Sequence, residues 1–181
     1  QDLLHGLRKI APPRSVDGTD EEETAAGVDA LLRRISLFLE DRDFESAGAY
    51  CERVLDLEPE NAEAYVCKLL VERRLTSEAE LPDCDTPLPE SGSYQKALRF
   101  AGPARAERLR QYAAAQTYNR AARLESEQAG EESLRRAAEL FSSISGYRDA
   151  AERARDCTAR AESARLAQLY RHATELLSRN E

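Results

Sequence analysis

The sequence is poor in the residues that favour β-strands. It has no Trp, aromatic side chains make up 6% of its 181 residues, and Val and Ile are scarce beside Ala, Leu, Arg and Glu. These four abundant residues lose little conformational freedom in a helix. We therefore predict an all-α protein.

Histidine and cysteine are too few and too scattered for a metal centre. His5 and His172 are the only histidines, too few for a His-rich metal site. The cysteines form no C-x-x-C pair, which argues against a zinc ribbon and a dense disulfide framework. We expect core positions for Cys51, Cys67 and Cys157, and a poor nucleophile at Cys84, where Asp83 and Asp85 would raise the thiol pKa. No metal and no cofactor are predicted.

Long apolar runs and catalytic signatures are also missing. No stretch approaches the roughly 20 apolar residues that span a bilayer, and no cationic start precedes an apolar run. We expect no membrane segment, and a cytoplasmic, reducing location. A net charge of −8 argues against a nucleic-acid partner. The motifs G-x-x-x-x-G-K-[ST], G-x-S-x-G and H-E-x-x-H do not occur, so we predict no catalytic residues and no enzyme.

What the chain does contain is a phrase repeated three times: an aromatic residue, two mostly polar residues and alanine. The copies begin at Phe44, Tyr94 and Tyr147. Each is predicted to open the second helix of an antiparallel helix pair, so the chain looks assembled from degenerate copies of one unit.

Helix boundaries can be predicted from capping signals. Thr19 and Glu22 form a capping-box pattern, which predicts a helix running to about Glu40. A turn at 41–43 then leads to a second helix that ends before Pro59. Further helices are expected over 62–74, from Tyr94 to about 101, over 103–127 and from Glu131 onward. Residues 75–92 carry three prolines and are predicted to be an insertion without regular structure.

The span from Val28 to Asn61 resembles a tetratricopeptide repeat, whose length is about 34 residues. Its key positions are filled by Leu31, Ile35, Phe38, Ala47, Cys51, Val54 and Pro59. Corresponding positions in a later unit hold Leu134, Ala138, Phe141, Tyr147, Ala150, Ala154 and Cys157. The resemblance implies an α-solenoid of a degenerate bacterial type with units at about 28–61, 62–101 and 131–164. A long C-terminal helix to about Arg179 would cap the stack.

The predicted domain organisation is simple. Residues 1–18 form an N-terminal segment, either a short helix over Leu3–Ile10 or a disordered end, and residues 19–181 form a single domain. Because the chain begins with Gln1 and not Met, an anchor or a further domain outside this segment is left open.

The resemblance also implies a concave groove lined by the first helix of each pair. The candidate partner-binding residues are those at the second, fifth and ninth positions: Asp29, Leu32, Ser36, Glu63, Val66, Leu70, Glu132, Arg135 and Glu139. None is Lys or Asn, so the carboxylate clamp of chaperone-binding relatives is not implied. Leu32, Val66 and Leu70 fit either an apolar partner site or burial within the protein.

The leading hypothesis is a non-catalytic scaffold or adaptor that binds a peptide or a helix of another protein. One alternative is a regulatory or sensory domain of a larger polypeptide, which the start at Gln1 motivates. Another is a helical enzyme with dispersed carboxylates and arginines. A solenoid with an uncapped face can also pair with its twin, so a homodimer is a further possibility.

Overall fold

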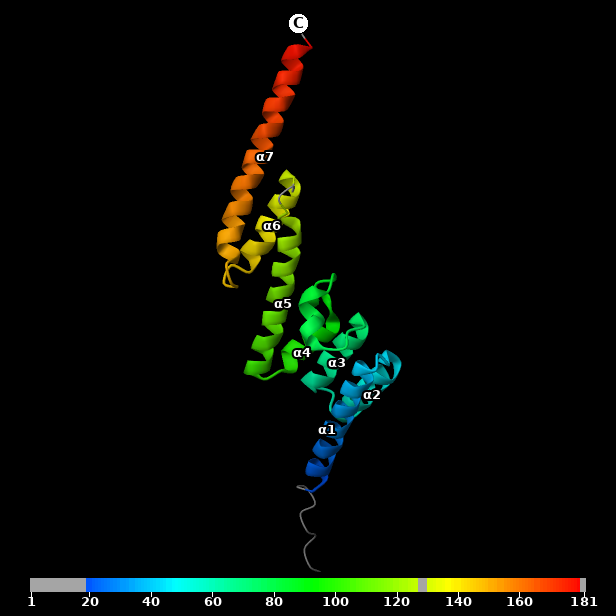
Figure 1. Ribbon diagram of the computed structural model, residues 1–181. Helices are drawn as coiled ribbons and strands as arrows, with labels where there is room; N and C mark the ends of the chain where they lie inside the picture. Colours follow the sequence, from blue (N-terminus) through cyan, green and yellow to red (C-terminus); the bar gives the residue numbers. More distant parts are fainter. Residues whose placement is uncertain (1–18, 127–129, 180–181) are drawn as a thin grey trace, which may run out of the picture.

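The protein is all-helical over the residues that the computed structural model describes, 19–126 and 130–179 (Figure 1). Side chains are described from residue 26 onward. The seven α-helices and two 3₁₀ helices of this part are α1 (Thr19–Glu40), α2 (Phe44–Leu57), α3 (Ala62–Arg73), η1 (Glu78–Asp83), η2 (Leu88–Glu90), α4 (Gly92–Phe100), α5 (Pro103–Leu124), α6 (Glu131–Ser143) and α7 (Ala150–Ser178).

Local capping explains why the first helices begin and end where the sequence predicts. Arg42 reverses the chain after α1 with a φ of 61°. The carboxylate of Asp43 then accepts a hydrogen bond from the backbone N–H of Ser46 at 3.1 Å, which satisfies a free donor of α2. Asn61 caps α3 in the same way through the N–H of Ala64 at 2.9 Å.

The helices pack in sequence order along an elongated molecule (Figure 1). α1 packs on α2, α3 on both α2 and α4, and α6 on α7. The long helix α5 runs through the middle, with η1 and η2 against one part of it and α6 against another. α1 and α2 therefore lie toward one end of the molecule, and the end of α7 projects at the other.

Two separate groups of buried side chains form the core. The first extends from Val28 on α1 to Leu109 on α5, and the second from Ala121 on α5 to Ala161 on α7. α5 is the element that joins them. The second group consists mostly of alanine, so each of its residues removes little apolar area from water.

The prediction that residues 75–92 lack regular structure is wrong. They fold into η1 and η2, and the side chains of Leu81 and Leu88 are fully buried. Two apolar anchors, together with polar contacts from α5 described below, compensate the cost of ordering this proline-rich segment.

The repeated aromatic phrase begins a helix only in its first copy. Phe44 is the first residue of α2, whereas Tyr94 is already the third residue of α4. Tyr147 lies in the turn before α7, and the following Arg148 has a φ of 49°. The prediction that Tyr147 opens a helix is therefore wrong: its ring packs edge-on against Tyr118 instead.

The long C-terminal helix is present, but only its first half packs on another helix. Ala150, Ala154, Cys157 and Ala161 are buried, whereas from residue 165 to 179 every side chain is exposed. The second half thus caps no described part of the fold. The apolar stretch at Leu3–Ile10 lies outside the described residues.

Candidate functional site

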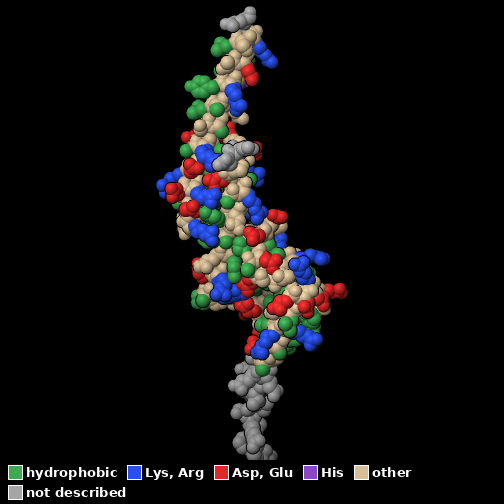
Figure 2. Space-filling model, viewed as in Figure 1, with side chains coloured by type: hydrophobic (Ala, Val, Ile, Leu, Met, Phe, Trp, Pro, Cys, Tyr) green, Lys and Arg blue, Asp and Glu red, His purple; other side chains and the backbone are tan. Residues whose placement is uncertain are grey.

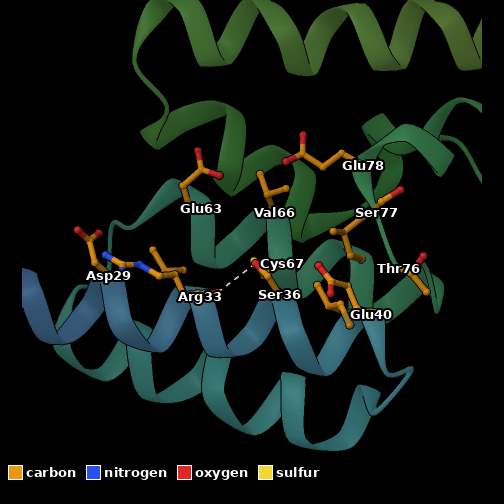
Figure 3. A pocket seen from close by; sticks show the side chains of 13 residues that line it. Asp29, Arg33, Ser36, Glu40, Glu63, Val66, Cys67, Thr76, Ser77 and Glu78 are labelled. Atoms are coloured by element: carbon orange, nitrogen blue, oxygen red, sulfur yellow. Dashed lines mark hydrogen bonds between the residues drawn. The ribbon is translucent and has the colours of Figure 1, made fainter.

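A hollow of about 550 Å³ lies between α1 and α3. We call it the α1–α3 hollow. Figure 3 shows its lining: Asp29, Arg33, Ser36 and Glu40 come from α1, Glu63, Val66 and Cys67 from α3, and Thr76, Ser77 and Glu78 form one end. The side walls belong to α1 and α3, and the end wall belongs to residues 75–92.

The floor of the hollow is apolar and largely closed. Val66 and Leu70 belong to the first core group, with only 1% of Val66 exposed. Leu32 is half-buried and is the apolar side chain of the floor that still reaches solvent from α1. A ligand would therefore meet a small apolar spot surrounded by polar groups.

The rim carries mainly negative charge. Asp29, Glu40, Glu63 and Glu78 line the hollow with Arg33 as the one arginine among its lining residues. Such an excess of one charge in a concave surface raises the local concentration of ligands of the opposite sign. The rim therefore favours a cationic ligand.

Arg105 on α5 fixes the position of two of these carboxylates. Its Nε and Nη2 donate to Glu63 at 2.7 and 2.8 Å, and its Nη1 and Nη2 donate to Glu78 at 2.8 and 2.7 Å. The hydrogen bonds with Glu78 and with Glu63 raise the pKa of the guanidinium, which is permanently charged. A planar guanidinium with two carboxylates ties α3, η1 and α5 together at the edge of the hollow.

Gln116 holds the insertion that supplies the end wall. Its Oε1 accepts from the N–H of Leu88 at 2.8 Å, and its Nε2 donates to the carbonyls of Cys84 and Thr86, both at 2.8 Å. One turn further along α5, Asn119 donates to the carbonyl of Pro82 at 3.2 Å. These bonds give the insertion backbone partners in place of a regular helix or sheet.

The structure brings six of the nine predicted groove residues together. Asp29, Leu32, Ser36, Glu63, Val66 and Leu70 all line the α1–α3 hollow. Val66 and Leu70 do so as floor residues that are buried against the protein itself. That this hollow binds a partner stays a prediction.

The other three predicted residues lie elsewhere, on α6. Glu132 and Arg135 are exposed, and Arg135 pairs with Glu131 at 2.6 Å. Glu139 lines a second hollow of about 500 Å³ between α5 and α6, together with Arg120, Arg123 and Arg136. The nine residues therefore do not line one continuous groove: six line the α1–α3 hollow, and Glu139 lines a hollow of different charge.

Sequence reasoning missed the end wall and its arginine. Thr76, Ser77 and Glu78 belong to the segment that was predicted to be irregular, and Arg105 is 42 residues from Glu63. No local pattern links these positions, because the pairing depends on how α5 packs against η1 and α4.

The four cysteines differ in burial, and burial raises the pKa of two of the thiols. Cys51 and Cys157 are buried, and Cys67 and Cys84 are half-buried. Burial, followed by the charges of Asp83 and Asp85, raises the pKa of the Cys84 thiol in the predicted direction, although nearby Arg73 opposes it. Burial and Glu125 raise the pKa of Cys157 to about 11.

Among the described residues no group of His, Cys, Asp and Glu is arranged to hold a metal ion, and no helix there is long and apolar enough to cross a bilayer.

Comparisons of this chain with protein-family models, with curated proteins and with solved structures find no match.

Proposed function

We propose that the protein is a non-catalytic scaffold of the tetratricopeptide-like class, and that it binds a basic peptide or helix of a partner protein in the α1–α3 hollow. The observation that carries this proposal is the lining of the hollow: α1 and α3 present Asp29, Glu40 and Glu63 around a small apolar spot, and η1 adds Glu78. Groove binding of a helix or an extended peptide uses such a combination of apolar anchors and charged rim.

The repeat architecture is supported by burial at matched positions. Ile35, Ala47 and Cys51 in the first unit and Ala138, Ala150 and Ala154 in the third are all buried. Two stretches of sequence thus use the same positions for their core, as degenerate copies of one unit would. Four free thiols support a reducing, cytoplasmic location.

The proposed ligand follows from the chemistry of the rim. Arginine or lysine side chains would pair with Asp29, Glu40 and Ser36 along α1, and one apolar side chain would cover Leu32. Exposed charges at the rim act mainly on the association rate and are screened by salt, so binding should weaken as ionic strength rises.

The test is capture of partners from the native lysate with matched variants of α1. Leu32→Glu places a charge in the hollow, whereas Leu37→Glu places the same charge on an exposed leucine of the same helix outside it. We expect a partner that is retained by the wild type and by Leu37→Glu, lost with Leu32→Glu, and released by salt. A partner retained equally by all three proteins would contradict the proposal.

A severe loss of thermal stability in Leu32→Glu would show that this residue serves the core. The exposed Ser36 provides the second variant, because Ser36→Arg adds a positive charge to the hollow without filling a buried space. If Ser36→Arg also retains every partner, the hollow is not the binding site.

A further inference from the structure

The second half of α7 carries a concentration of exposed apolar side chains. Among the described residues seven large apolar side chains are exposed, and five of them lie here: Leu166, Leu169, Tyr170, Leu176 and Leu177. Tyr170 is 73% exposed and Leu177 is 71% exposed. Single exposed apolar residues are ordinary, but a contiguous group of this kind marks an interaction surface.

These residues lie on one face of the helix, and it is not the face that packs on α6. Leu166, Leu169, Ala173 and Leu176 follow one another at spacings of three and four residues, as an apolar helix face requires. Leu166 is five residues beyond Ala161, the last buried residue, which places it about 140° around the helix from the packed face. α7 therefore changes its apolar face halfway along its length, as a helix with two different partners would.

Basic side chains border this second face. Arg165, His172 and Arg179 recur every seven residues beside Leu169 and Leu176. Figure 2 shows hydrophobic side chains along one edge of the projecting end of α7 and charged side chains of both signs along the other. From residue 163 to 179 the sequence contains three arginines and a single acid, Glu175, in a chain of net charge −8.

We propose that residues 165–179 of one molecule dock in the α1–α3 hollow of a second copy, so that molecules associate head to tail. The inference rests on the proposed function of that hollow as a docking site. The arginines of this row complement the carboxylates of Asp29 and Glu40, which the hollow leaves exposed, and the leucines beside them meet the apolar spot at Leu32.

The lengths of the two surfaces agree. At about 1.5 Å per residue, the α1 wall from Asp29 to Glu40 is about 16 Å long. The stripe from Leu166 to Leu177 spans the same number of residues and so the same length. One docked segment would fill the hollow from end to end.

The docking must join two molecules, because the two surfaces lie far apart in one. The α1–α3 hollow belongs to the end of the molecule that contains α1, and the free half of α7 projects at the opposite end (Figure 1). Each molecule then offers one helix and one hollow. Such a heterologous contact repeats and builds open chains unless its rotation closes a ring.

Pairing of α7 with α7 fits the charges less well. In a parallel pair Arg165 and Arg179 each lie beside the same residue of the partner. In an antiparallel pair centred at residue 172, Arg165 of each helix lies beside Arg179 of the other. Both arrangements bring like charges together, whereas the acidic hollow brings opposite ones.

The test measures the mass of the assembly by sedimentation equilibrium at low salt. We expect the average mass of the wild type to rise with concentration and to fall again when salt is added. A helix variant, Leu169→Glu with Leu176→Glu, and a hollow variant, Asp29→Lys with Ser36→Arg, should each associate at least tenfold more weakly. All four positions are solvent-exposed, so these changes leave the core intact.

The decisive step is to mix the two variants. The helix variant keeps its hollow and the hollow variant keeps its helix, so the mixture should form one-to-one dimers that grow no further. Leu37→Glu, on α1 outside the hollow, serves as the control and should associate like the wild type. A mixture that stays monomeric, or a hollow variant that associates like the wild type, would overturn the head-to-tail arrangement.

Further outcomes separate self-association from membrane binding and from the proposed function of the hollow. A monomeric wild type that binds vesicles containing 30% phosphatidylglycerol, with binding lost in the helix variant, would overturn self-association in favour of an anionic lipid surface. A monomeric wild type that still loses a lysate partner on Leu32→Glu overturns this inference and leaves the proposed function standing. If both self-association and partner capture are independent of the hollow, both proposals fail.

Discussion

At the scale of single residues, Gln116 is the polar side chain on which the insertion depends most. It is 1% exposed and makes three hydrogen bonds to backbone groups of residues 84–88. Gln116→Leu would leave those groups without partners, and we expect a loss of about 3 kcal/mol in the free energy of unfolding. Urea denaturation followed by circular dichroism measures it.

Gln95 supplies the matched control for Gln116. Its Nε2 also donates to a backbone carbonyl of the insertion, that of Pro89 at 2.9 Å, but the bond is exposed to water. Gln95→Leu should therefore change stability by no more than about 0.5 kcal/mol. Equal losses in the two variants would show that burial is not what makes Gln116 important.

A second residue-scale prediction concerns acid stability at the turn before α7. The hydroxyl of Tyr118 donates to Asp149 Oδ1 at 2.6 Å and holds the pKa of that carboxyl below its ordinary value of 3.8. A lowered pKa in the folded state stabilises the protein above pH 3.8 and ceases to do so as pH falls through the folded value.

Tyr118→Phe removes this hydrogen bond. We expect the pKa of Asp149 to move up toward 3.8 in an NMR titration, and the variant to be less stable than the wild type at neutral pH. Part of that difference should disappear below the wild-type pKa of Asp149, because the hydrogen bond from Tyr118 favours the charged carboxylate over the protonated form. A stability difference that is constant down to strong acid would mean that Asp149 contributes nothing.

At the scale of elements, the sequence predicted those features that depend on near neighbours. The turn at 41–43 and the break at Pro103 depend on residues within about four positions, and the helices begin and end close to where they were expected. The insertion was mispredicted because its order comes from Gln116, about 30 residues further along the chain. Its prolines indicate irregular backbone, but they carry no information about a partner on α5.

The candidate site was also predictable only in part: its residues on α1 were identified, but the packing around them was not. The resemblance to a tetratricopeptide repeat selected Asp29, Leu32 and Ser36 as groove residues, and they do line the hollow. The burial of Val66 depends on the helices that pack around it. The position of α6 outside this hollow depends on the packing of other helices as well. Those properties arise from packing between elements, which spacing within one helix does not specify.

The two halves of α7 should differ in dynamics. Residues 150–161 pack on α6, whereas residues 165–178 have no packing partner within the described part of one molecule. A helix of that length without tertiary contacts is marginal in water. In dilute solution we expect amides of 165–178 to exchange hydrogen at least tenfold faster than those of 150–161, measured by mass spectrometry.

The exchange rates also respond to the docking proposed for this segment. Raising the concentration into the range where the wild type associates should protect residues 165–178 and leave 150–161 unchanged. If protection of the second half stays low in the associated protein, α7 does not take part in the contact.

At the scale of the whole molecule, the division of the core into two groups sets how the protein unfolds. Within the described part of the chain α5 contributes buried side chains to both groups, and the group around α6 and α7 is built mainly from alanine with Leu134 and Phe141 as its large members. The group around α1 to α4 buries larger side chains, among them Ile35 and Leu69. We therefore expect the α6–α7 half to open at lower denaturant concentration than the other half.

Phe141→Ala tests this division directly. Phe141 is fully buried, and its ring lies 5.4 Å from that of Tyr118 and 4.7 Å from the guanidinium of Arg153. The substitution should lower the free energy of unfolding of the α6–α7 half by about 4 kcal/mol and leave that of the other half unchanged. Hydrogen exchange in urea should then show α6 and α7 unprotected while α1 to α4 keep wild-type protection.

Leu69→Ala weakens the first core group instead. Because α5 contributes to both groups, we expect this variant to lose protection in α6 and α7 as well as in α1 to α4. If both variants instead unfold the protein in a single step, α5 couples the two groups into one cooperative unit.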